Sequence, residues 1–292
     1  MDGILIINKP KGRTSHDIVS KVKKIVGNKV GHTGTLDPNA TGVLPLLIGK
    51  GTLCSQYLME HDKIYEVVLK LGTQTDTADS EGNVIKEKAV LESNLNKKNV
   101  TEVLRSFLGK QEQTPPIYSA IKVNGKKLYE YARKGQDVEI KPREIEIYKC
   151  ELKQINIKEK EICFTVHCSK GTYIRSLCED IANKLDTLGY MKELNRIKVG
   201  KFDIVDSITV EELEENITNE NFINKHFISI EKTFYEKDSI TVADNRLKHL
   251  INGVKLSFHL KDNLYRIYDE KNNFIGIGSV KNYLLKREII LD

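Results

Sequence analysis

The spacing of apolar residues along the chain predicts strands and helices in irregular alternation. Alternating apolar and polar positions, or a short apolar run bounded by glycine and proline, predict strands. These strand segments are residues 3–8, 43–48, 64–71, 145–153 and 161–168. Apolar residues that recur every three or four positions predict helices. The helical segments are residues 15–26, which Ser15 is expected to cap, 100–108, 126–134 and 171–185. Strands and helices that mix without a regular βαβ repeat favour an α+β sheet protein.

The pattern changes toward the C-terminus. Residues 211–238 are polar and rich in Asn and Glu, which is typical of a connecting stretch. The last fifty or so residues contain short strand-like pieces at 265–268, 274–280 and 289–291, with glycines at predicted turns. We therefore expect two domains, residues 1–235 and a small β-rich domain at residues 236–292.

Composition narrows the function classes. The chain has 292 residues, with 46 Lys+Arg against 41 Asp+Glu, so its mild positive charge permits a polyanionic partner without requiring one. Its apolar runs are all shorter than the roughly 18 residues of a membrane span, and its first residues turn polar too early for a signal peptide. The five cysteines are scattered, with no CxxC pair. We expect a cytoplasmic protein without disulfides.

Motifs for cofactors and metals are not found in the sequence. It contains neither GxxxxGK[ST] nor a GxGxxG followed by an acidic partner, and its His and Cys residues show no ligand spacing. A nucleotide-dependent enzyme or a metalloenzyme is disfavoured. We expect no cofactor and no metal.

Residues 30–46, VGHTGTLDPNATGVLPL, are the most informative segment. Asp37 lies between a glycine-rich approach and Pro38, which favours extended geometry for the residue before it and stiffens the loop. Such a loop can aim a carboxylate. Taken alone, an Asp-Pro dipeptide indicates no more than the start of a turn.

The whole segment resembles the signature GHxGxLDPxAxGxLP of the TruB-type pseudouridine synthases, which modify the uridine at position 55 in the T-loop of tRNA. Four further blocks are similar in the same order: GILIINKPKGRTSHDIV, IYEVVLKLGTQTDTADSEG, PPIYSAIKVNGKKLYEYARKG and CSKGTYIRSLCEDIA. The resemblance covers almost all of residues 1–205, and the C-terminal segment is similar to the small RNA-binding PUA domain of bacterial members. The chain is identified as a member of this family.

The resemblance implies a fold, a substrate and a reaction. The catalytic domain is expected to contain a mixed, largely antiparallel sheet with flanking helices, followed by a PUA-like domain. The substrate is expected to be the T-arm stem-loop of tRNA, bound by a monomer without membrane or obligate protein partner. A stacked T-loop uridine has to be flipped out before its glycosidic bond can be cleaved and re-formed through C5.

The resemblance also assigns catalytic residues. Asp37 is the catalytic carboxylate, Tyr65 lies against the target base, and Arg175 pairs with Asp37. Without the resemblance, Tyr65 reads as an ordinary packing residue on a strand face, and Arg175 as a solvated helix arginine. Whether Asp37 adds to the base, attacks the sugar or removes a proton stays open.

Further residues are assigned to substrate binding. By resemblance, His32 lies next to the flipped base, Tyr173 contacts the nucleotide, and Ile197 is an apolar residue near the base. By default, His32 would be a structural hydrogen-bonder and Ile197 a core residue.

A basic turn is expected to contact phosphate groups, with a solvated surface cluster as its alternative. It consists of Lys9, Lys11 and Arg13. Family members often read LRR where this chain has Asn195 in the middle position, so a positive charge near the RNA is missing there.

Two other functions remain open. One is a non-catalytic RNA-binding or tRNA-folding protein that uses the same groove. The other is a relative that acts on ribosomal RNA with guide RNAs, although such chains usually carry long basic extensions and this one has no lysine-rich tail.

Overall fold

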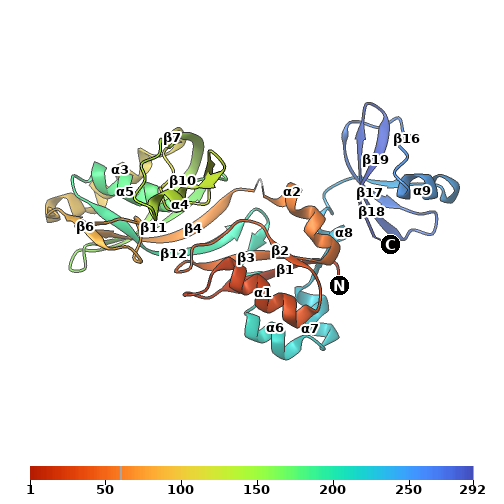
Figure 1. Ribbon diagram of the computed structural model, residues 1–292, viewed down its shortest axis with the longest axis horizontal. Coiled ribbons are helices and arrows are strands. Elements are labelled where there is room, and N and C mark those ends of the chain that lie inside the picture. The colour runs from red at the N-terminus through yellow and green to blue at the C-terminus, as the bar shows by residue number, and fades with distance from the viewer. Residues whose placement is uncertain (60, 292) are drawn as a thin grey trace.

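The computed structural model describes residues 1–59 and 61–291. A ten-stranded mixed sheet forms the centre of the larger part of the molecule (Figure 1). Its strand order is β14 (Ile228–Ser229), β1 (Gly3–Lys9), β3 (Thr41–Ile48), β12 (Gly189–Val199), β4 (Lys63–Leu71), β11 (Glu161–Cys168), β10 (Arg143–Asn156) and β7 (Gly109–Gln113). β2 (Val30–His32) pairs with β3, and β13 (Phe202–Asp203) pairs with β12. β3 and β12 run parallel, whereas the other neighbours that lie along this order are antiparallel. The predicted α+β class is confirmed.

Helices pack on this sheet in two groups. α3 (Lys97–Arg105) and α5 (Ile174–Lys184) share a core with β4, β10 and β11, and α1 (Ser15–Val26) and α6 (Val210–Asn216) share another with β1 and β3. The buried positions of β4 are Tyr65, Val67, Leu69 and Leu71, as its alternation predicted. Further short helices of this part are α2 (Ser55–Leu58), α7 (Glu220–His226) and α8 (Ile230–Thr233), with 3-10 turns η1 (Gly49–Cys54), η2 (Glu92–Leu95) and η3 (Ile204–Asp206).

Two expectations about local structure need correction, and one strand is missing from the prediction. The N-cap of α1 is Thr14, whose hydroxyl accepts from Asp17 N in a capping box, and Ser15 is not the cap. Residues 211–238 are not a plain connection, because α6, α7 and α8 lie within or next to them. The central strand β12 was not predicted at all.

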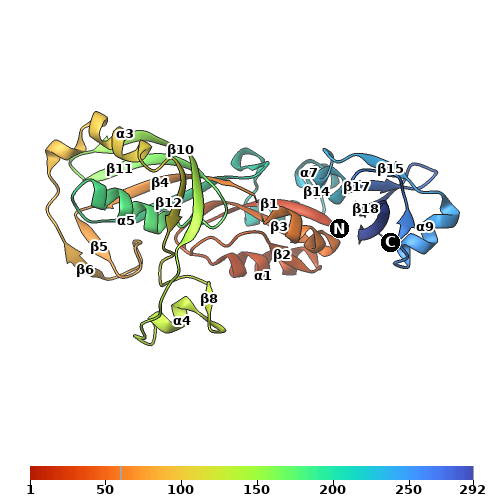
Figure 2. The same cartoon turned by 90° about the horizontal axis from the view of Figure 1, so that it is seen from above.

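An arm projects from the body between β7 and β10 (Figure 2). It contains a small hairpin, β8 (Lys122–Val123) with β9 (Lys126–Lys127), followed by α4 (Leu128–Ala132). A second hairpin, β5 (Thr73–Thr75) with β6 (Val84–Glu87), lies after β4. The residues on either side of the first hairpin and the loop within the second take part in the candidate site described below.

The C-terminal part has its own five-stranded sheet, which lies beside the main body. The order is β15 (Ser239–Thr241), β17 (Asn263–Tyr268), β18 (Phe274–Lys281), β19 (Leu284–Ile290) and β16 (Leu256–Ser257), with α9 (Asp244–Ile251) packed on it. Ile277 and Ile289 belong to an apolar cluster that also contains Ile4 and Phe202 of the main body. The two parts therefore share buried apolar surface. No helix in the described part of the chain is both long and apolar enough to cross a membrane.

Candidate active site

The loop that carries Asp37 connects β2 to β3 and is fixed on both sides of that residue. Ala40 N donates to the carbonyl of Asp37 at 3.1 Å, so Asp37 also starts a turn with Pro38 as its second residue. Before it, the buried hydroxyl of Ser15 accepts from Leu36 N at 2.9 Å and donates to Leu36 O at 3.1 Å. The loop thus holds the carboxylate on a stiff support.

Lys9 holds the same loop from the other side. Its side chain is fully buried at 0% exposure, and its ammonium donates to the carbonyls of Pro10 at 2.9 Å, Arg13 at 2.6 Å and Pro38 at 3.0 Å. An ammonium with three donors that is surrounded by these carbonyls cannot reach a phosphate. The assignment of Lys9 as a phosphate contact is corrected, whereas Lys11 and Arg13 are exposed beside it.

Replacing Lys9 by methionine is expected to destabilise the fold by about 1–3 kcal/mol, because buried carbonyls lose their donor. Burial lowers the pKa of Lys9 from 10.5 to about 8. The unfolded chain therefore binds this proton more tightly, and wild-type stability relative to the variant should rise between pH 8 and 10.5. Urea unfolding across this range measures both effects, with Lys11→Met as the exposed control. Equal stability of wild type and Lys9→Met would contradict the assigned role.

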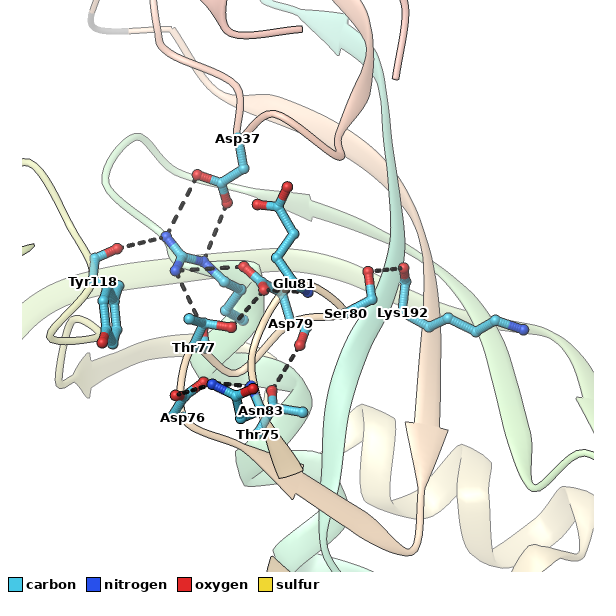
Figure 3. Close-up of polar contacts among 11 residues, drawn as sticks. Asp37, Thr75, Asp76, Thr77, Asp79, Ser80, Glu81, Asn83, Tyr118 and Lys192 are labelled. Carbon is cyan, nitrogen blue, oxygen red and sulfur yellow. Dashed lines mark hydrogen bonds and ion pairs between the residues drawn. The ribbon is translucent and has the colours of Figure 1, made fainter. Parts of the chain in front are cut away.

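Arg175 forms a fork around the carboxylate of Asp37. Its Nε lies 3.2 Å from Oδ2 of Asp37 and its Nη2 lies 3.5 Å from Oδ1. Its side chain is 8% exposed, whereas that of Asp37 is 35% exposed. The same guanidinium donates to the carbonyls of Thr77 at 3.3 Å and Tyr118 at 3.0 Å, and lies 3.7 Å from Asp79. Figure 3 shows Asp37, Tyr118, and the pair Thr77 and Asp79 around this guanidinium, which carries no label there; they come from three different loops. The carboxylate is thereby held in one direction.

The start of α5 places Arg175. The buried side chain of Gln113, at the end of β7, accepts from Tyr173 N at 2.8 Å and donates to Tyr173 O at 3.0 Å. One turn further, Ser176 Oγ donates to the carbonyl of Thr114 at 3.0 Å. The base of the arm and the first turn of α5 are therefore bonded together.

Competing effects set the protonation of Asp37. Burial raises its pKa above the ordinary value, and the nearby charge of Asp79 raises it further, whereas Arg175 and then Lys9 lower it. The net direction is upward. The loop therefore presents a carboxylate that is partly desolvated yet paired with a guanidinium, as suits a group that takes part in chemistry.

Asp79 is a member of this network that the sequence analysis missed. Its Oδ1 accepts from Thr77 Oγ1 at 2.6 Å and from Glu81 N at 3.0 Å, which leaves Oδ2 for Arg175. The segment TQTDTADSEGN has the composition of a polar surface loop. The one signal for a further role was that Asp79 is an acidic residue within a block that resembles the family. Asp79 is nevertheless buried.

A cavity of about 590 Å³ opens in front of Asp37 and Arg175. Its lining includes Tyr65, which is 8% exposed and whose pKa burial raises to about 12. Other side chains around it come from the arm, from α5 and from β12; they are Tyr118, Tyr129, Tyr173, Met191, Leu194 and Arg196. The structure therefore brings together the predicted residues Asp37, Tyr65, Tyr173 and Arg175 around one cavity that several tyrosines line.

Two residues that were predicted to lie near the target base do not line this cavity. His32 lies on β2, where its buried Nδ1 has no hydrogen-bond partner among the residues that the structure describes, and burial together with Arg196 lowers its pKa. Ile197 follows Arg196 at an irregularity of β12 and is not among the lining residues. The role of Ile197 near a base thus has no support from its position.

Asn195, where the resemblance implies an arginine, hydrogen-bonds to side chains of the two neighbouring strands. Its amide donates to Glu66 at 3.1 Å and accepts from the hydroxyl of Thr41 at 3.2 Å. β12 also lies so close to Gly42, which has φ +103°, that a side chain there would meet the backbone of Arg196. This tight contact joins β12 to the strand that follows the Asp37 loop.

Comparisons with known proteins agree over most of the chain. The family model described as TruB family pseudouridylate synthase (N terminal domain) matches residues 22–174, and tRNA pseudouridylate synthase B C-terminal domain matches residues 175–235. The tRNA pseudouridine synthase B of Clostridium kluyveri is 48% identical, with 98% of each chain covered. That of Caldanaerobacter subterraneus subsp. tengcongensis is 43% identical, with 95% of each chain covered.

Solved structures share the fold. The crystal structure of a Cbf5-Nop10-Gar1 complex matches with a TM-score of 0.71 and 25% identity, covering 99% of this chain and 84% of that chain. An H/ACA RNP bound to a substrate RNA containing 2'-deoxyuridine also matches with a TM-score of 0.71, at 23% identity, covering 99% of this chain and 85% of that one. The similarity thus extends from residue order to three-dimensional arrangement.

Proposed function

Since this chain belongs to the TruB family of pseudouridylate synthases, we propose that it isomerises the uridine at position 55, in the T-loop of tRNA, with Asp37 as its catalytic carboxylate. The enzyme is an isomerase that forms pseudouridine in tRNA, and its fold is of the pseudouridine-synthase type. The observation that carries the finer proposal is the Asp37–Arg175 ion pair at the edge of a cavity that tyrosines line.

The chemistry needs no redox step and consumes no water. Breaking the bond between C1' and N1 leaves an electron-poor sugar carbon and an electron-rich base, and the base rejoins C1' through C5. The C5 proton is released and N1 gains a proton, so the atoms balance. In this proposal the carboxylate of Asp37 acts on the nucleotide that enters the cavity, and Arg175 keeps the carboxylate in one direction.

The cavity implies that the uridine leaves its stack. Removing one base from a stacked loop costs a few kcal/mol. Tyr65 and Tyr173 line the cavity and can offset this cost by contact with the base. Lys11 and Arg13 are exposed. They lie next to the Asp37 loop, because Gly12 N, between them, donates to Pro38 O at 2.9 Å. We assign them, with His32, to the RNA around the flipped nucleotide.

The projecting arm is a second RNA contact in this proposal. It carries exposed cations on the side chains of Lys122, Lys126 and Lys134, and its residues Tyr118 and Tyr129 line the cavity. An RNA backbone that runs along this arm would bring the following nucleotide close to Asp37. Phosphate contacts of this kind position an RNA without reading its sequence.

Residues 236–292 are proposed to be a PUA-like domain that contacts tRNA away from the T-arm. Lys255, Lys281 and Lys286 surround one hollow of its sheet and are exposed. Deleting the domain would uncover the apolar contacts of Ile277 and Ile289 with the main body. Point substitutions of the lysines therefore test the domain better than truncation.

Changing Lys255, Lys281 and Lys286 to glutamine is expected to raise KM for full-length tRNA about tenfold and to weaken its salt dependence, since phosphate contacts are lost. KM for an isolated T-arm hairpin should stay unchanged. The matched set, Lys122, Lys126 and Lys134 to glutamine on the arm, should raise KM for both substrates. Steady-state kinetics at two salt concentrations measure this. An unchanged KM for tRNA in the C-terminal variant would exclude the assigned contact.

We further propose that the enzyme works as a monomer, because Asp37, Tyr65 and Arg175 meet around one cavity without a partner subunit, and that it acts in the cytoplasm, in line with its tRNA substrate. A tRNA-folding activity without catalysis is the alternative use of the same groove. Mixing Asp37→Asn protein with misfolded tRNA separates the two: recovery of aminoacylation without pseudouridine would reveal a folding activity in its own right.

The position of the product tests the proposed substrate. Unmodified tRNA transcript is incubated with the wild-type protein, treated with a carbodiimide that marks pseudouridine, and read by primer extension. A single stop at the T-loop uridine is expected. A stop elsewhere in the tRNA, with none in the T-loop, would overturn the proposed target while leaving the reaction class intact.

A further inference from the structure

Arg196 is a buried cation in the middle of the sheet that the reaction described above does not use. Its side chain is 1% exposed. Its Nε donates to Val43 O at 2.8 Å and its Nη2 donates to Gly34 O at 2.9 Å. Arg196 is the cross-strand partner of Tyr65 where β12 pairs with β4, and both residues line the cavity. Within residues 1–59 and 61–291, no carboxylate forms an ion pair with it.

This arrangement differs from that of Arg175, whose charge Asp37 and Asp79 balance. Burying a guanidinium without a carboxylate is costly, and carbonyl oxygens compensate only part of the lost hydration. A structural role alone would be filled by a neutral donor at lower cost. A full positive charge that lines a cavity suits a site where negative charge develops during the reaction.

Tyr65 is the residue through which the positive charge of Arg196 acts on a group in the cavity. Burial raises the pKa of Tyr65 to about 12, with Cys168 and Asp37 raising it as well, whereas Arg196 lowers it. The phenol therefore keeps its proton at neutral pH. A guanidinium has only donors, so a hydrogen bond between these cross-strand neighbours runs from Arg196 to the phenol oxygen and leaves the phenolic hydrogen available to another acceptor.

We propose that Arg196 is a positioning residue that acts through Tyr65: it holds the phenol oxygen so that the phenolic hydrogen is donated to a carbonyl oxygen of the flipped uracil. The inference rests on the proposed function. When the C1'–N1 bond breaks, its electron pair leaves with the base and spreads onto the two carbonyl oxygens. Tyr65 strengthens its hydrogen bond to one of them, and no proton changes owner in this step.

Two physical effects set how much Tyr65 and Arg196 are expected to contribute to the reaction rate. A donor aimed at developing negative charge in a site that excludes water contributes roughly 10²–10³-fold in rate. A hydrogen bond into the donor's own oxygen polarises its O–H and strengthens the next bond in the chain. Arg196 is therefore expected to contribute less than Tyr65, and to contribute only while the Tyr65 hydroxyl is present.

A double-mutant cycle tests this dependence. The rate of a single turnover at saturating enzyme is measured for wild type, Tyr65→Phe, Arg196→Lys and the double variant on T-arm hairpin RNA. Tyr65→Phe should lower the rate about 10²-fold. Arg196→Lys should lower it about tenfold in the wild-type background, but less than about twofold when Tyr65 is already phenylalanine.

The matched control is Arg175→Lys in the same two backgrounds, which should lower the rate by the same factor in both because it acts on Asp37. Equal losses from Arg196→Lys in both backgrounds would overturn the proposal and leave Arg196 as a support for the Asp37 loop. Activity of the wild type on the hairpin is measured in the same series, so failure of the proposed function is seen separately.

A second measurement covers the case in which Arg196→Lys does not fold. Site-specific 3-fluorotyrosine at position 65 makes the phenol more acidic, and so a better donor and a weaker base, with little change in size. The single-turnover rate should stay equal or rise. A fall in rate would overturn the proposal, because it would show that Tyr65 accepts a proton from the substrate.

Discussion

Asp37→Asn protein is expected to bind tRNA and to form no pseudouridine above background. The substitution keeps the shape of the side chain and its turn but removes the charge that Arg175 directs into the cavity. Losing the reacting group of an enzyme lowers kcat by on the order of 10⁴-fold or more. Single-turnover kinetics and filter binding on the same preparation separate chemistry from binding.

The same variant should be at least as stable as the wild type. Because burial raises the Asp37 pKa, Asp37 contributes stability at low pH, and this contribution is lost as the pH rises through the folded-state pKa. At pH 7 the ionised carboxylate therefore costs stability that an amide does not. Urea unfolding measures this, with exposed Asp206→Asn as the control. A destabilised Asp37→Asn protein, or one that keeps more than about 1% of the wild-type rate, would contradict the assigned role.

Arg175→Met is expected to lower the single-turnover rate at neutral pH by roughly 10²–10³-fold. Methionine fills much of the space but leaves Asp37 and Asp79 without their cation. Since Arg175 lowers the Asp37 pKa, its loss should move the acid limb of the pH–rate profile to higher pH, so part of the rate returns as the pH is raised. The measurement is a pH profile of the single-turnover rate.

Arg175→Lys gives the intermediate case. It restores a charge, so the acid limb should move back toward that of the wild type, while the rate stays low because an ammonium cannot form the fork. Arg105→Lys, on the exposed end of α3, controls for the preparation. An Arg175→Met profile that has the wild-type shape and is only scaled down would show that Arg175 does not set the ionisation of Asp37.

The parts of this site that the sequence predicted are those where pattern and chemistry agree. The alternation of β4 placed Tyr65 on its buried face, and glycines with Pro38 indicated a shaped loop at Asp37. β12 was missed because register shifts after Met191 and after Arg196 break the period of two, and because a buried arginine interrupts the apolar pattern. A central strand that carries a functional charge thus resembles a surface segment.

The second limit of prediction from the sequence was that it does not show which charged side chains are buried. Rules of composition place lysine and aspartate at the surface, so Lys9 was assigned to a phosphate and Asp79 to a solvated loop. Only the tertiary structure shows that carbonyls surround Lys9 and that Arg175 faces Asp79. By contrast, α6 could have been predicted, since Thr209 and Glu212 form a capping box at its start.

The most direct test of the account is release of tritium from tRNA transcript labelled at C5 of uridine, in EDTA, with wild-type and Asp37→Asn protein side by side. Forming the new bond at C5 expels the label, so the wild type should release one tritium per tRNA, and none when the T-loop uridine is replaced by cytidine. Asp37→Asn should release none from either RNA. Release by Asp37→Asn at the wild-type rate, or no release by the wild type, would contradict an Asp37-dependent isomerisation of this uridine.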